Sequence, residues 1–474
     1  MFKKQRAGNF LLFALFAGLS VVGKPVLAQQ AAKPNILVIV TDDQRFNTIH
    51  ALGNRYIQTP NMDRLKRRGV AFTRAHILGA NSGAVCAPSR AMLLSGKPYY
   101  QLPECFMNAG CDYPTFPAYF RSQGYETFET GKWHNSREAF KSSFTTADNI
   151  FLGGMHQEQT GGHNTPRLYH FDSSGKYPAA SQFTGDHFSS EYYAEAAVKY
   201  LEQKKDASPF LMYVAFTAPH DPRTPPAEFA KRYDSARIPL PLNYLPEHPF
   251  DNGEMEVRDE KLLPSPRDTN LVKKEIASYY AMITEVDDCI GKVLDALEKS
   301  GKANNTLIVF TADNGLAVGQ HGLLGKQNLY DHSMRVPLII SGPGLPADTR
   351  RNALCTLTDI FPTLCEYAGL KTPEGLEGQS LLPVVKKTSS GRSEIYTAYK
   401  DVQRAVRTAD NWKLIWYKVK GRETKQLFNL ENDPAEMHNL SGKSAFFTRE
   451  RQLSELLEKH MKEVNDSFVT KQPG

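Results

Sequence analysis

Residues 35–40 read NILVIV and lead directly into Thr41, Asp42 and Asp43. Apart from Asn35 the run is entirely apolar, so it predicts a strand that is buried on both faces. Comparable runs occur at Phe210–Phe216, Thr306–Phe310 and Val336–Ile340, with a weaker one at Tyr125–Phe128. Helical patterns lie between them, for example at Ser190–Lys204 and Lys273–Lys299. Strands that alternate with helices predict an α/β fold, with a large mixed, mostly parallel sheet sandwiched by helices.

Two long segments lack a clear strand or helix pattern. Gly153–His187 is rich in Gly, His, Ser and Thr, and Ile238–Arg267 is rich in Pro. Loops of this length in a compact domain are usually functional or mobile. The first of them is a candidate rim for substrate binding.

A polar stretch at Lys386–Ser393 predicts a domain boundary. We expect residues 33–385 to form the α/β domain that carries the chemistry. Residues 386–474 contain a strand pattern at Lys413–Tyr417 and a helix pattern from Thr448 to Val464. They predict a smaller C-terminal α+β domain.

The N-terminus has the composition of a secretory signal peptide. Three basic residues precede an uncharged, apolar run over residues 7–23, and Val26-Leu27-Ala28 offers small residues to signal peptidase. We therefore expect residues 1–28 to be removed and the protein to be periplasmic or secreted. The alternative is a retained membrane anchor, but the run is barely long enough to span a bilayer.

The charge of the chain depends largely on this leader. Residues 1–28 hold four basic side chains and no acid, so their removal lowers the formal charge from +6 to +2. The remaining chain has no basic arm, which argues against nucleic acid as a partner. A small anionic substrate, bound by local charge, remains compatible with this balance.

The chain has six cysteines, at positions 86, 105, 111, 289, 355 and 365. Some can pair in an oxidising compartment. Cys105 and Cys111 are the best candidates, because Asn108 and Gly110 lie between them and can turn the chain. If Cys86 is unpaired, an odd number remains, which indicates buried thiols or a cysteine with another use.

Four predicted strands end in residues that can bind ions or transfer protons. Ligands of open α/β sheets bind beyond the carboxyl ends of the strands, and the segments found there are Thr41–Asp43, Thr130–His134, Ala218–His220 and Thr311–Gly315. One Asp after a strand is often only a cap or turn residue. Three carboxylates in one crevice, from Asp42, Asp43 and Asp313, would repel one another unless a cation neutralised them. With the amide oxygen of Asn314 they favour Ca²⁺, then Mg²⁺, over Zn²⁺.

Cys86 opens the stretch CAPSRAMLLSGK, residues 86–97. Pro88 suits the first turn of a helix, so Cys86 would lie just before a helix N-terminus, where negative charge is favoured. Arg90 adds a positive charge one turn further on. The pattern favours a nucleophilic thiol of lowered pKa over a buried structural cysteine, although exported free thiols tend to oxidise.

Cys86-Ala-Pro-Ser-Arg90, with Ser95-Gly96-Lys97 behind it, resembles the signature of the type I sulfatases of the alkaline phosphatase superfamily. Motifs that are similar to others of this family follow in family order and cover nearly the whole chain after the leader: Lys33–Leu37 with Asp42-Asp43, Gly131–His134, Ala218–His220, Thr311–Gly315, His321–Lys326, and Leu427–Leu430 with Asp433–Leu440. The resemblance implies an alkaline-phosphatase-like fold and hydrolysis of sulfate esters.

The resemblance also implies a modified residue. In this family a maturation enzyme reads Cys-x-Pro-x-Arg and converts the cysteine to formylglycine, and Cys86, Pro88 and Arg90 satisfy that rule. Position 86 would then start as a thiol and act as a hydrated aldehyde. The metal ligands implied are Asp42, Asp43, Asp313 and Asn314, with residue 86 beside the Ca²⁺.

The remaining roles follow from the same resemblance. Lys132 and Lys326 would stabilise charge on the sulfuryl oxygens, and His220, with the help of Lys326, would protonate the leaving alcohol. His134 would assist the second hydroxyl at position 86. Arg90 would position the diol, and His321 is a candidate for substrate contact.

We therefore expect an exported sulfatase that acts on a sulfated saccharide or glycan and depends on a formylglycine-generating enzyme. One alternative is a phosphodiesterase or phosphonate monoester hydrolase, which shares the fold and can share the formylglycine. A second alternative is a catalytically inactive binding protein of the same fold. We expect neither nucleic acid nor a stable membrane anchor among its partners.

Overall fold

The NILVIV stretch forms β1, a strand inside a ten-stranded sheet with the order β11-β2-β10-β9-β1-β8-β4-β5-β6-β7. The structure is a computed structural model that describes residues 1, 33–103, 105–106, 111–466 and 468. The strands of this sheet are β1 Asn35–Thr41, β2 Gly69–His76, β4 Glu126–Lys132, β5 Thr146–Phe151, β6 Arg167–Tyr169, β7 Gln182–Thr184, β8 Phe210–Ala215, β9 Thr306–Ala312, β10 Arg335–Ser341 and β11 Thr349–Thr356.

The sheet is mixed and mostly parallel, as predicted. The adjacent strands β9, β1, β8, β4 and β5 all run parallel. β10 is antiparallel to β9 and β2, and β6 and β7 add an antiparallel edge. Pro337 lies within β10, where it cannot donate to the ladder. The register of β10 against β2 shifts between Val336 and Leu338, which accommodates this proline.

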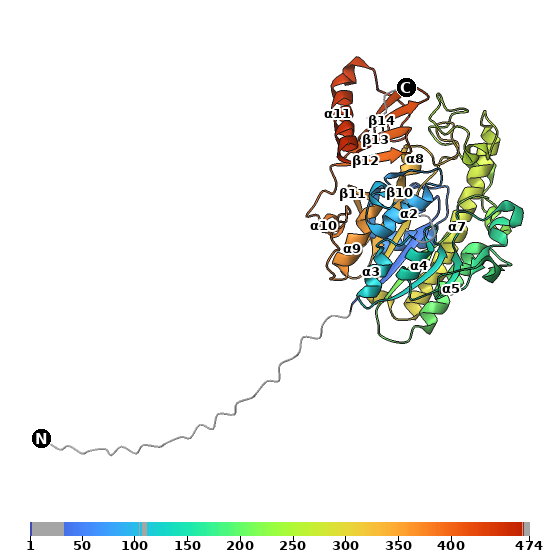
Figure 1. Cartoon of the computed structure of the whole chain (residues 1–474), viewed down its shortest axis with the longest axis vertical. Helices are drawn as coiled ribbons and strands as arrows, with labels where there is room; N and C mark the ends of the chain where they lie inside the picture. Colours follow the sequence, from blue (N-terminus) through green and yellow to red (C-terminus); the bar gives the residue numbers. More distant parts are fainter. Residues whose placement is uncertain (2–32, 104, 107–110, 467, 469–474) are drawn as a thin grey trace. The chain divides into compact units, whose positions relative to one another are not determined.

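Helices cover both faces of the sheet because β1 has apolar side chains on both. Ile36, Val38 and Val40 belong to one buried apolar cluster, and Leu37 and Ile39 belong to the other. Figure 1 shows α5 Ser189–Gln203 and α7 Thr269–Lys299 on one side of the sheet. The other side holds α2 Cys86–Ser95, α3 Phe116–Ser122, α4 Arg137–Ser143 and α9 Ile360–Tyr367. The same part of the chain also contains the α-helices α1 Pro60–Arg68, α6 Ala227–Ala230, α8 Asp331–Met334 and α10 Leu382–Val385.

The C-terminal part is a second sheet with one long helix. Its order is β15-β14-β13-β12-β3, built from β12 Glu394–Tyr399, β13 Gln403–Thr408, β14 Trp412–Val419, β15 Arg422–Asn429 and the short β3 Gly79–Ala80. The helix α11, Phe447–Glu463, packs on it through a separate apolar cluster. This confirms the predicted α+β architecture. β3 pairs in parallel with β12, so the described residues after Lys33 form one compact unit. The boundary at residue 386 stays a prediction.

The two predicted loops differ in structure. Gly153–His187 contains β6 and β7, each of three residues, together with short 3-10 turns. Strands this short carry too little alternation to be seen in the sequence. Ile238–Arg267 holds one four-residue 3-10 turn, η7 Arg258–Lys261, and is otherwise irregular.

The disulfide between Cys105 and Cys111 is present, as predicted. Cys86, Cys289, Cys355 and Cys365 are free and buried. The predicted signal peptide, residues 1–28, lies outside the described residues apart from Met1. Among the helices that the structure describes, none has both the length and the apolar composition required to cross a membrane.

Candidate active site

The carboxyl ends of β1, β4, β8 and β9 meet around the first turn of α2. A cavity of about 290 Å³ opens there. Its lining contains Cys86, His134, His220 and Lys326, four of the residues singled out from the sequence. The strand-end segments thus converge at one edge of the sheet, as expected for an open α/β fold.

Cys86 is the first residue of α2 and is only 2% exposed. The Nζ atoms of Lys132 and Lys326 lie 3.5 and 3.8 Å from its Sγ. Burial raises the pKa of the Cys86 thiol, and the two lysines offset this only in part. The expectation of a thiol with lowered pKa is therefore wrong for unmodified Cys86, because spacing in the sequence does not reveal desolvation.

The three carboxylates lie together and are buried. One oxygen atom from each of Asp42, Asp43 and Asp313 lies within 4.8 Å of the other two. The backbone N–H of Asp43 donates to Asp313 Oδ1 at 3.1 Å, and Asn314 Nδ2 donates to Asp43 Oδ1 at 2.6 Å. Burial, followed by the charge of Asp42, raises the pKa of Asp313 above its ordinary value. The pKa of Asp42 is lowered instead, because the charges of Lys132 and other nearby basic side chains outweigh the effect of burial.

Two oxygens of this cluster are left without a partner. Asp42 Oδ1 and Asn314 Oδ1 are buried and accept no hydrogen bond from any described residue. An unpaired buried acceptor is costly, so both atoms fit as ligands of a cation. Carboxylate and amide oxygens form the donor set that Ca²⁺ takes in proteins. The residues present therefore fit the metal predicted from the sequence.

Basic side chains surround the carboxylates. Lys132 Nζ lies 2.5 Å from Asp42 Oδ2, Lys326 Nζ lies 2.7 Å from Asp43 Oδ1, and Arg90 Nε lies 2.8 Å from Asp313 Oδ2. Arg90 also donates from Nη1 to the carbonyl oxygen of Lys132 at 2.7 Å. Arg90 thus ties α2 to both β9 and β4, and its guanidinium is fully buried.

Gly131 allows this approach of β4. Its φ is +106°, and a Cβ atom there would lie 1.9 Å from the carbonyl oxygen of Ala215 on β8. Only glycine fits such a close backbone contact without displacement. The side chain of Lys132, which follows, is directed to Asp42 and to the carbonyl oxygen of Gly154, at 2.5 Å.

His220 is held from both sides. Its Nε2 lies 3.7 Å from Asp43 Oδ2, and its Nδ1 lies 2.8 Å from the carbonyl oxygen and 3.3 Å from Oδ1 of Asp221. Arg258 binds the Asp221 carboxylate through both terminal nitrogens. The sequence analysis missed Asp221 and Arg258. The adjacent His220-Asp221 pair was a usable signal, but Arg258 lies in the irregular Pro-rich segment, where nothing marks it.

His134 lies at the end of β4 with a left-handed backbone, at φ 54°. Burial and the nearby charge of Lys132 hold the pKa of His134 well below its ordinary value. Its Nδ1 has no hydrogen-bond partner among the described residues. The imidazole is therefore neutral, and His134 lines the cavity that contains Cys86.

Unlike Cys86, His220 and Lys326, the predicted site residue His321 does not line this cavity. Its ring stacks on Tyr330, with centroids 4.0 Å apart, and its Nε2 accepts from Asn243 Nδ2 at 3.0 Å. Burial lowers the pKa of His321 to about 3. Its neighbours hold it as a packed, neutral ring.

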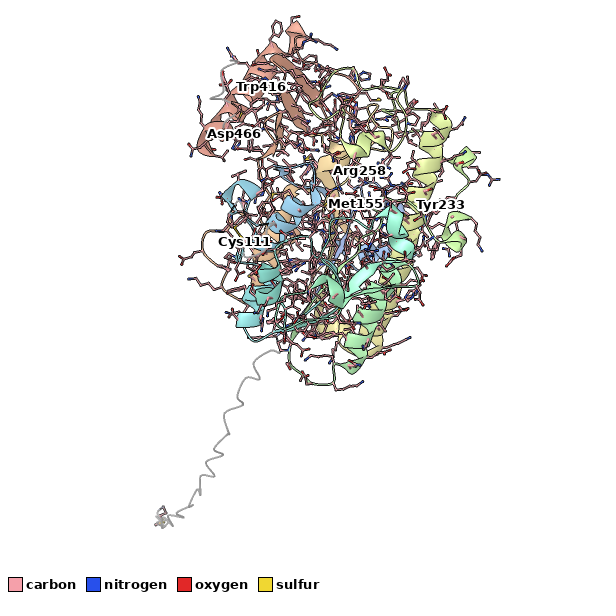
Figure 2. All side chains as sticks on the ribbon, turned by 45° about the vertical axis from the view of Figure 1, so that its right-hand side comes forward. Cys111, Met155, Tyr233, Arg258, Trp416 and Asp466 are labelled. Carbon is pink, nitrogen blue, oxygen red and sulfur yellow. A yellow bond between two sulfur atoms is a disulfide. The ribbon has the colours of Figure 1, made fainter. Side chains whose placement is uncertain are left out.

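Both long segments contribute walls to the cavity. Gly154 and Met155 come from the first, and Val257, Arg258 and Asp259 come from the second. Met155 and Arg258 lie close together (Figure 2). Access to Cys86 is therefore set by segments that lie outside the regular helices and main strands.

Comparison with known proteins agrees with this geometry. The family model described as Sulfatase matches residues 34–370, and one described as N-sulphoglucosamine sulphohydrolase, C-terminal, matches residues 319–463. The chain is 27% identical to an N-acetylglucosamine-6-O-sulfatase of Bacteroides thetaiotaomicron, over 93% of this chain and 88% of that protein.

Solved structures share the fold. One, a complex with its substrate D-glucosamine-2-N,6-O-disulfate, has a TM-score of 0.75 and 25% identity and covers 92% of this chain and 98% of its own. The phosphonate monoester hydrolase of Agrobacterium radiobacter has a TM-score of 0.71 at 20% identity, with 92% and 97% covered. The chain belongs to the sulfatase family, the hydrolases of sulfate esters.

Proposed function

We propose that this protein removes sulfate from a sulfated glycan, with a nucleophile derived from Cys86 and with bound Ca²⁺. The observation that carries the proposal is one cavity in which Cys86 lies between two buried lysine amines, beside a carboxylate cluster with unpaired oxygens. A sulfate group needs this combination of positive charge and a nucleophile at one point.

The metal would be held by Asp42, Asp43, Asp313 and Asn314, with residue 86 next to it. The support is the orphaned oxygens of Asp42 and Asn314 together with the hard-oxygen donor set. When bound, Ca²⁺ would supply positive charge that polarises the sulfate oxygens and acidifies a hydroxyl at position 86.

Formylglycine at position 86 would supply that hydroxyl after hydration. Two facts support it: the Cys86-Ala-Pro-Ser-Arg90 sequence and the burial of the side chain in the cavity. A maturation enzyme that reads this sequence would carry out the conversion.

Lys132 and Lys326 would bind the sulfuryl oxygens. Their amines flank residue 86 at 3.5 and 3.8 Å, so a sulfur atom bonded there would bring its oxygens within their reach. Both amines are already paired with carboxylates and are fixed in place. Positive charge that needs no rearrangement stabilises a transition state most effectively.

The two histidines would divide the proton transfers. His220 would give a proton to the alcohol oxygen of the leaving sugar, and Asp221 with Arg258 would hold its ring for this task. His134, kept neutral by burial, would take a proton from the second hydroxyl at position 86, which releases sulfate and restores the aldehyde. Arg90 would fix α2, and so residue 86, against Asp313.

The glycan substrate is supported by the relatives, which include an N-acetylglucosamine-6-O-sulfatase and a structure bound to a glucosamine disulfate. We also propose export, on the composition of residues 1–28. N-terminal sequencing of protein from the periplasmic fraction should then begin after Ala28. A mature protein that retained Met1 would contradict the export proposal.

The test is sulfate release from defined sulfated mono- and disaccharides by protein that is co-produced with a formylglycine-generating enzyme. Aryl sulfate, aryl phosphodiester and aryl phosphonate esters form a second panel. We expect the sulfate esters to be cleaved fastest. Faster cleavage of the phosphorus esters would favour the phosphonate hydrolase alternative, and tight binding of a saccharide without turnover, at fully converted residue 86, would favour a binding protein.

A further inference from the structure

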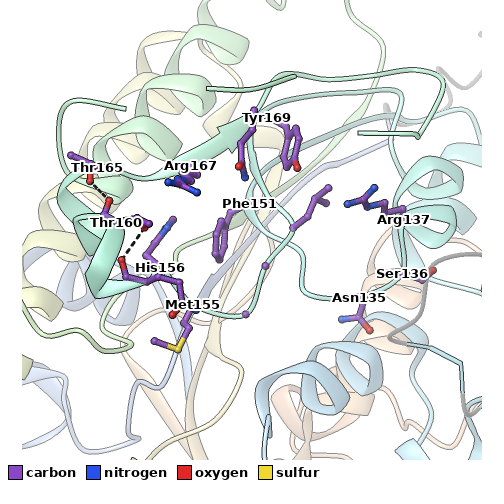
Figure 3. Close-up of a pocket in the computed structure, with 15 residues that line it drawn as sticks. Asn135, Ser136, Arg137, Phe151, Met155, His156, Thr160, Thr165, Arg167 and Tyr169 are labelled. Atoms are coloured by element: carbon purple, nitrogen blue, oxygen red, sulfur yellow. Dashed lines mark hydrogen bonds between the residues drawn. The ribbon is translucent and has the colours of Figure 1, made fainter. Parts of the chain in front are cut away.

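The structure has a second cavity of about 620 Å³, and Figure 3 shows the residues that line it. We call it the arginine pocket and define it by its central lining residues Arg137, Phe151, Met155, His156, Arg167 and Tyr169. They come from α4, from β5 with the segment after it, and from β6. Its volume lies within the range of about 300–1,000 Å³ that is typical of small-ligand pockets.

The arginine pocket and the Cys86 cavity share a thin wall. Gly154 and Met155 line both cavities, and Asn135 of the arginine pocket directly follows His134 of the Cys86 cavity. Gly154 adds no side chain to this wall. A Cβ atom there would lie 2.8 Å from His134 Nε2. The arginine pocket is therefore the cavity next to the one that holds residue 86.

The charged side chains that line the arginine pocket are two arginines, so its charge is positive. Arg137 and Arg167 lie on opposite sides of it, and the Arg137 guanidinium is directed into the space (Figure 3). The Arg137 side chain donates to the carbonyl oxygen of Lys176 at 2.7 Å. The exposed Arg167 side chain forms neither a hydrogen bond nor an ion pair with any described residue. None of the described residues that line the pocket is acidic.

The rest of the lining suits a sugar. The ring of Phe151 packs on that of His156, with centroids 4.1 Å apart, and both side chains are buried in the wall of the pocket. His156 is fixed through Nε2, 3.2 Å from the hydroxyl of Tyr193. Thr160, Gln157 and Gln182 add polar groups around it. A wall of packed rings with a few polar groups is typical of ligand sites.

We propose that the arginine pocket binds a second anionic group of the substrate, a sulfate or a carboxylate close to the sulfate ester that is cleaved. The guanidinium group matches both anions because it can donate two parallel hydrogen bonds. This inference rests on the proposed function for the identity of the ligand. The substrate would then be a glycan that carries at least two anionic groups on one sugar or on adjacent sugars.

The experiment compares three saccharides that share one cleavable sulfate. The first has no other anion, the second has a second sulfate on the same sugar, and the third has a neighbouring uronate carboxylate. Each is assayed with the wild-type, calcium-loaded, converted enzyme and with the variants Arg167→Ala, Arg167→Glu and Arg137→Ala. Arg422→Ala is the matched control, because Arg422 is also an exposed first residue of a strand and lines neither cavity. Calorimetric binding of the same saccharides is measured in a Cys86→Ala background.

We expect Arg167→Ala to lower kcat/KM by about 10- to 100-fold for a saccharide with a second anion, because the variant loses one or two charge-assisted hydrogen bonds. Arg167→Glu should lower it further, and the singly sulfated saccharide should be unaffected. Loss with only the second or only the third saccharide would identify the anion as sulfate or carboxylate. The unfolding temperature of each variant establishes that it is folded.

Equal losses for all three saccharides, or no loss for any, would overturn the inference while leaving the proposed function intact. If the wild type cleaved none of them but bound the doubly anionic ones through Arg167, the proposed function would fail and the arginine pocket would stand. Neither cleavage nor binding of any saccharide would overturn both.

Discussion

Glu285 lies on α7 with only 1% of its surface exposed, and the replacement Glu285→Gln should stabilise the protein in alkaline solution. Burial raises the pKa of Glu285 from 4.5 to about 8, and contacts with Ser190 and Cys289 offset this only in part. The Cys289 thiol donates to Glu285 Oε1 at 3.2 Å. Glutamine keeps the shape of the protonated acid and cannot ionise.

The sign follows from proton binding in the two states. Below pH 4.5 the folded and unfolded chains both hold the proton, and between pH 4.5 and about 8 only the folded chain does. The free energy of unfolding therefore falls as pH rises through this window, by up to about 1.4 kcal/mol per pH unit. Glu285→Gln does not lose stability in this way. Its free energy of unfolding relative to that of wild type should therefore rise by on the order of 4 kcal/mol between pH 5 and pH 9, which corresponds to about 4 °C in Tm for a chain of this size.

The assay is urea and thermal unfolding of both proteins at intervals from pH 5 to pH 9. Glu202→Gln, on the exposed face of α5, is the matched control and should follow wild type at every pH. Titration of all other groups cancels in the difference between variant and wild type. A difference that stays constant with pH, or that shrinks as pH rises, would refute the assignment of a buried, protonated Glu285.

Three further predictions concern the site and the disulfide. Lys132→Ala should lower kcat for sulfate release by about 10²- to 10³-fold, because it removes a fixed positive charge beside residue 86, and a kcat within twofold of wild type would contradict that role. Ca²⁺ added after EDTA treatment should raise the Tm of wild type by about 3 °C at a free concentration of 100 times Kd. Calorimetry of Asp42→Asn should show a much smaller rise, and an equal rise would exclude Asp42 as a ligand. Cys105→Ser should cost about 2 kcal/mol in urea unfolding, as expected for closing a short loop, and the reduced wild type should match the variant.

The sequence predicted the strands and helices that carry strong periodicity. NILVIV predicted a doubly buried strand, and the structure places β1 within the sheet with its side chains in two apolar clusters. Asp42 and Asp313 were predicted together because parallel strands end at one edge. This rule needs no knowledge of side-chain packing, which is why it succeeded.

The features that were not predicted from the sequence depend on tertiary contacts. Arg258 reaches Asp221 from an irregular segment whose path is set by packing. His321 shares a motif with Lys326, yet its ring turns to Tyr330 and away from the cavity. The burial that raises the pKa of Cys86 comes from residues distant in the sequence. None of these features leaves a pattern at the residue itself.

The central claim is that residue 86 becomes the nucleophile for sulfate-ester cleavage. It is tested most directly by sulfate release from a sulfated saccharide, with wild type and Cys86→Ala produced alongside a formylglycine-generating enzyme and with residue 86 followed by peptide mass. We expect wild type to release sulfate in proportion to the converted fraction and Cys86→Ala to release none. Release at the wild-type rate by Cys86→Ala, or no release by fully converted wild type, would contradict it.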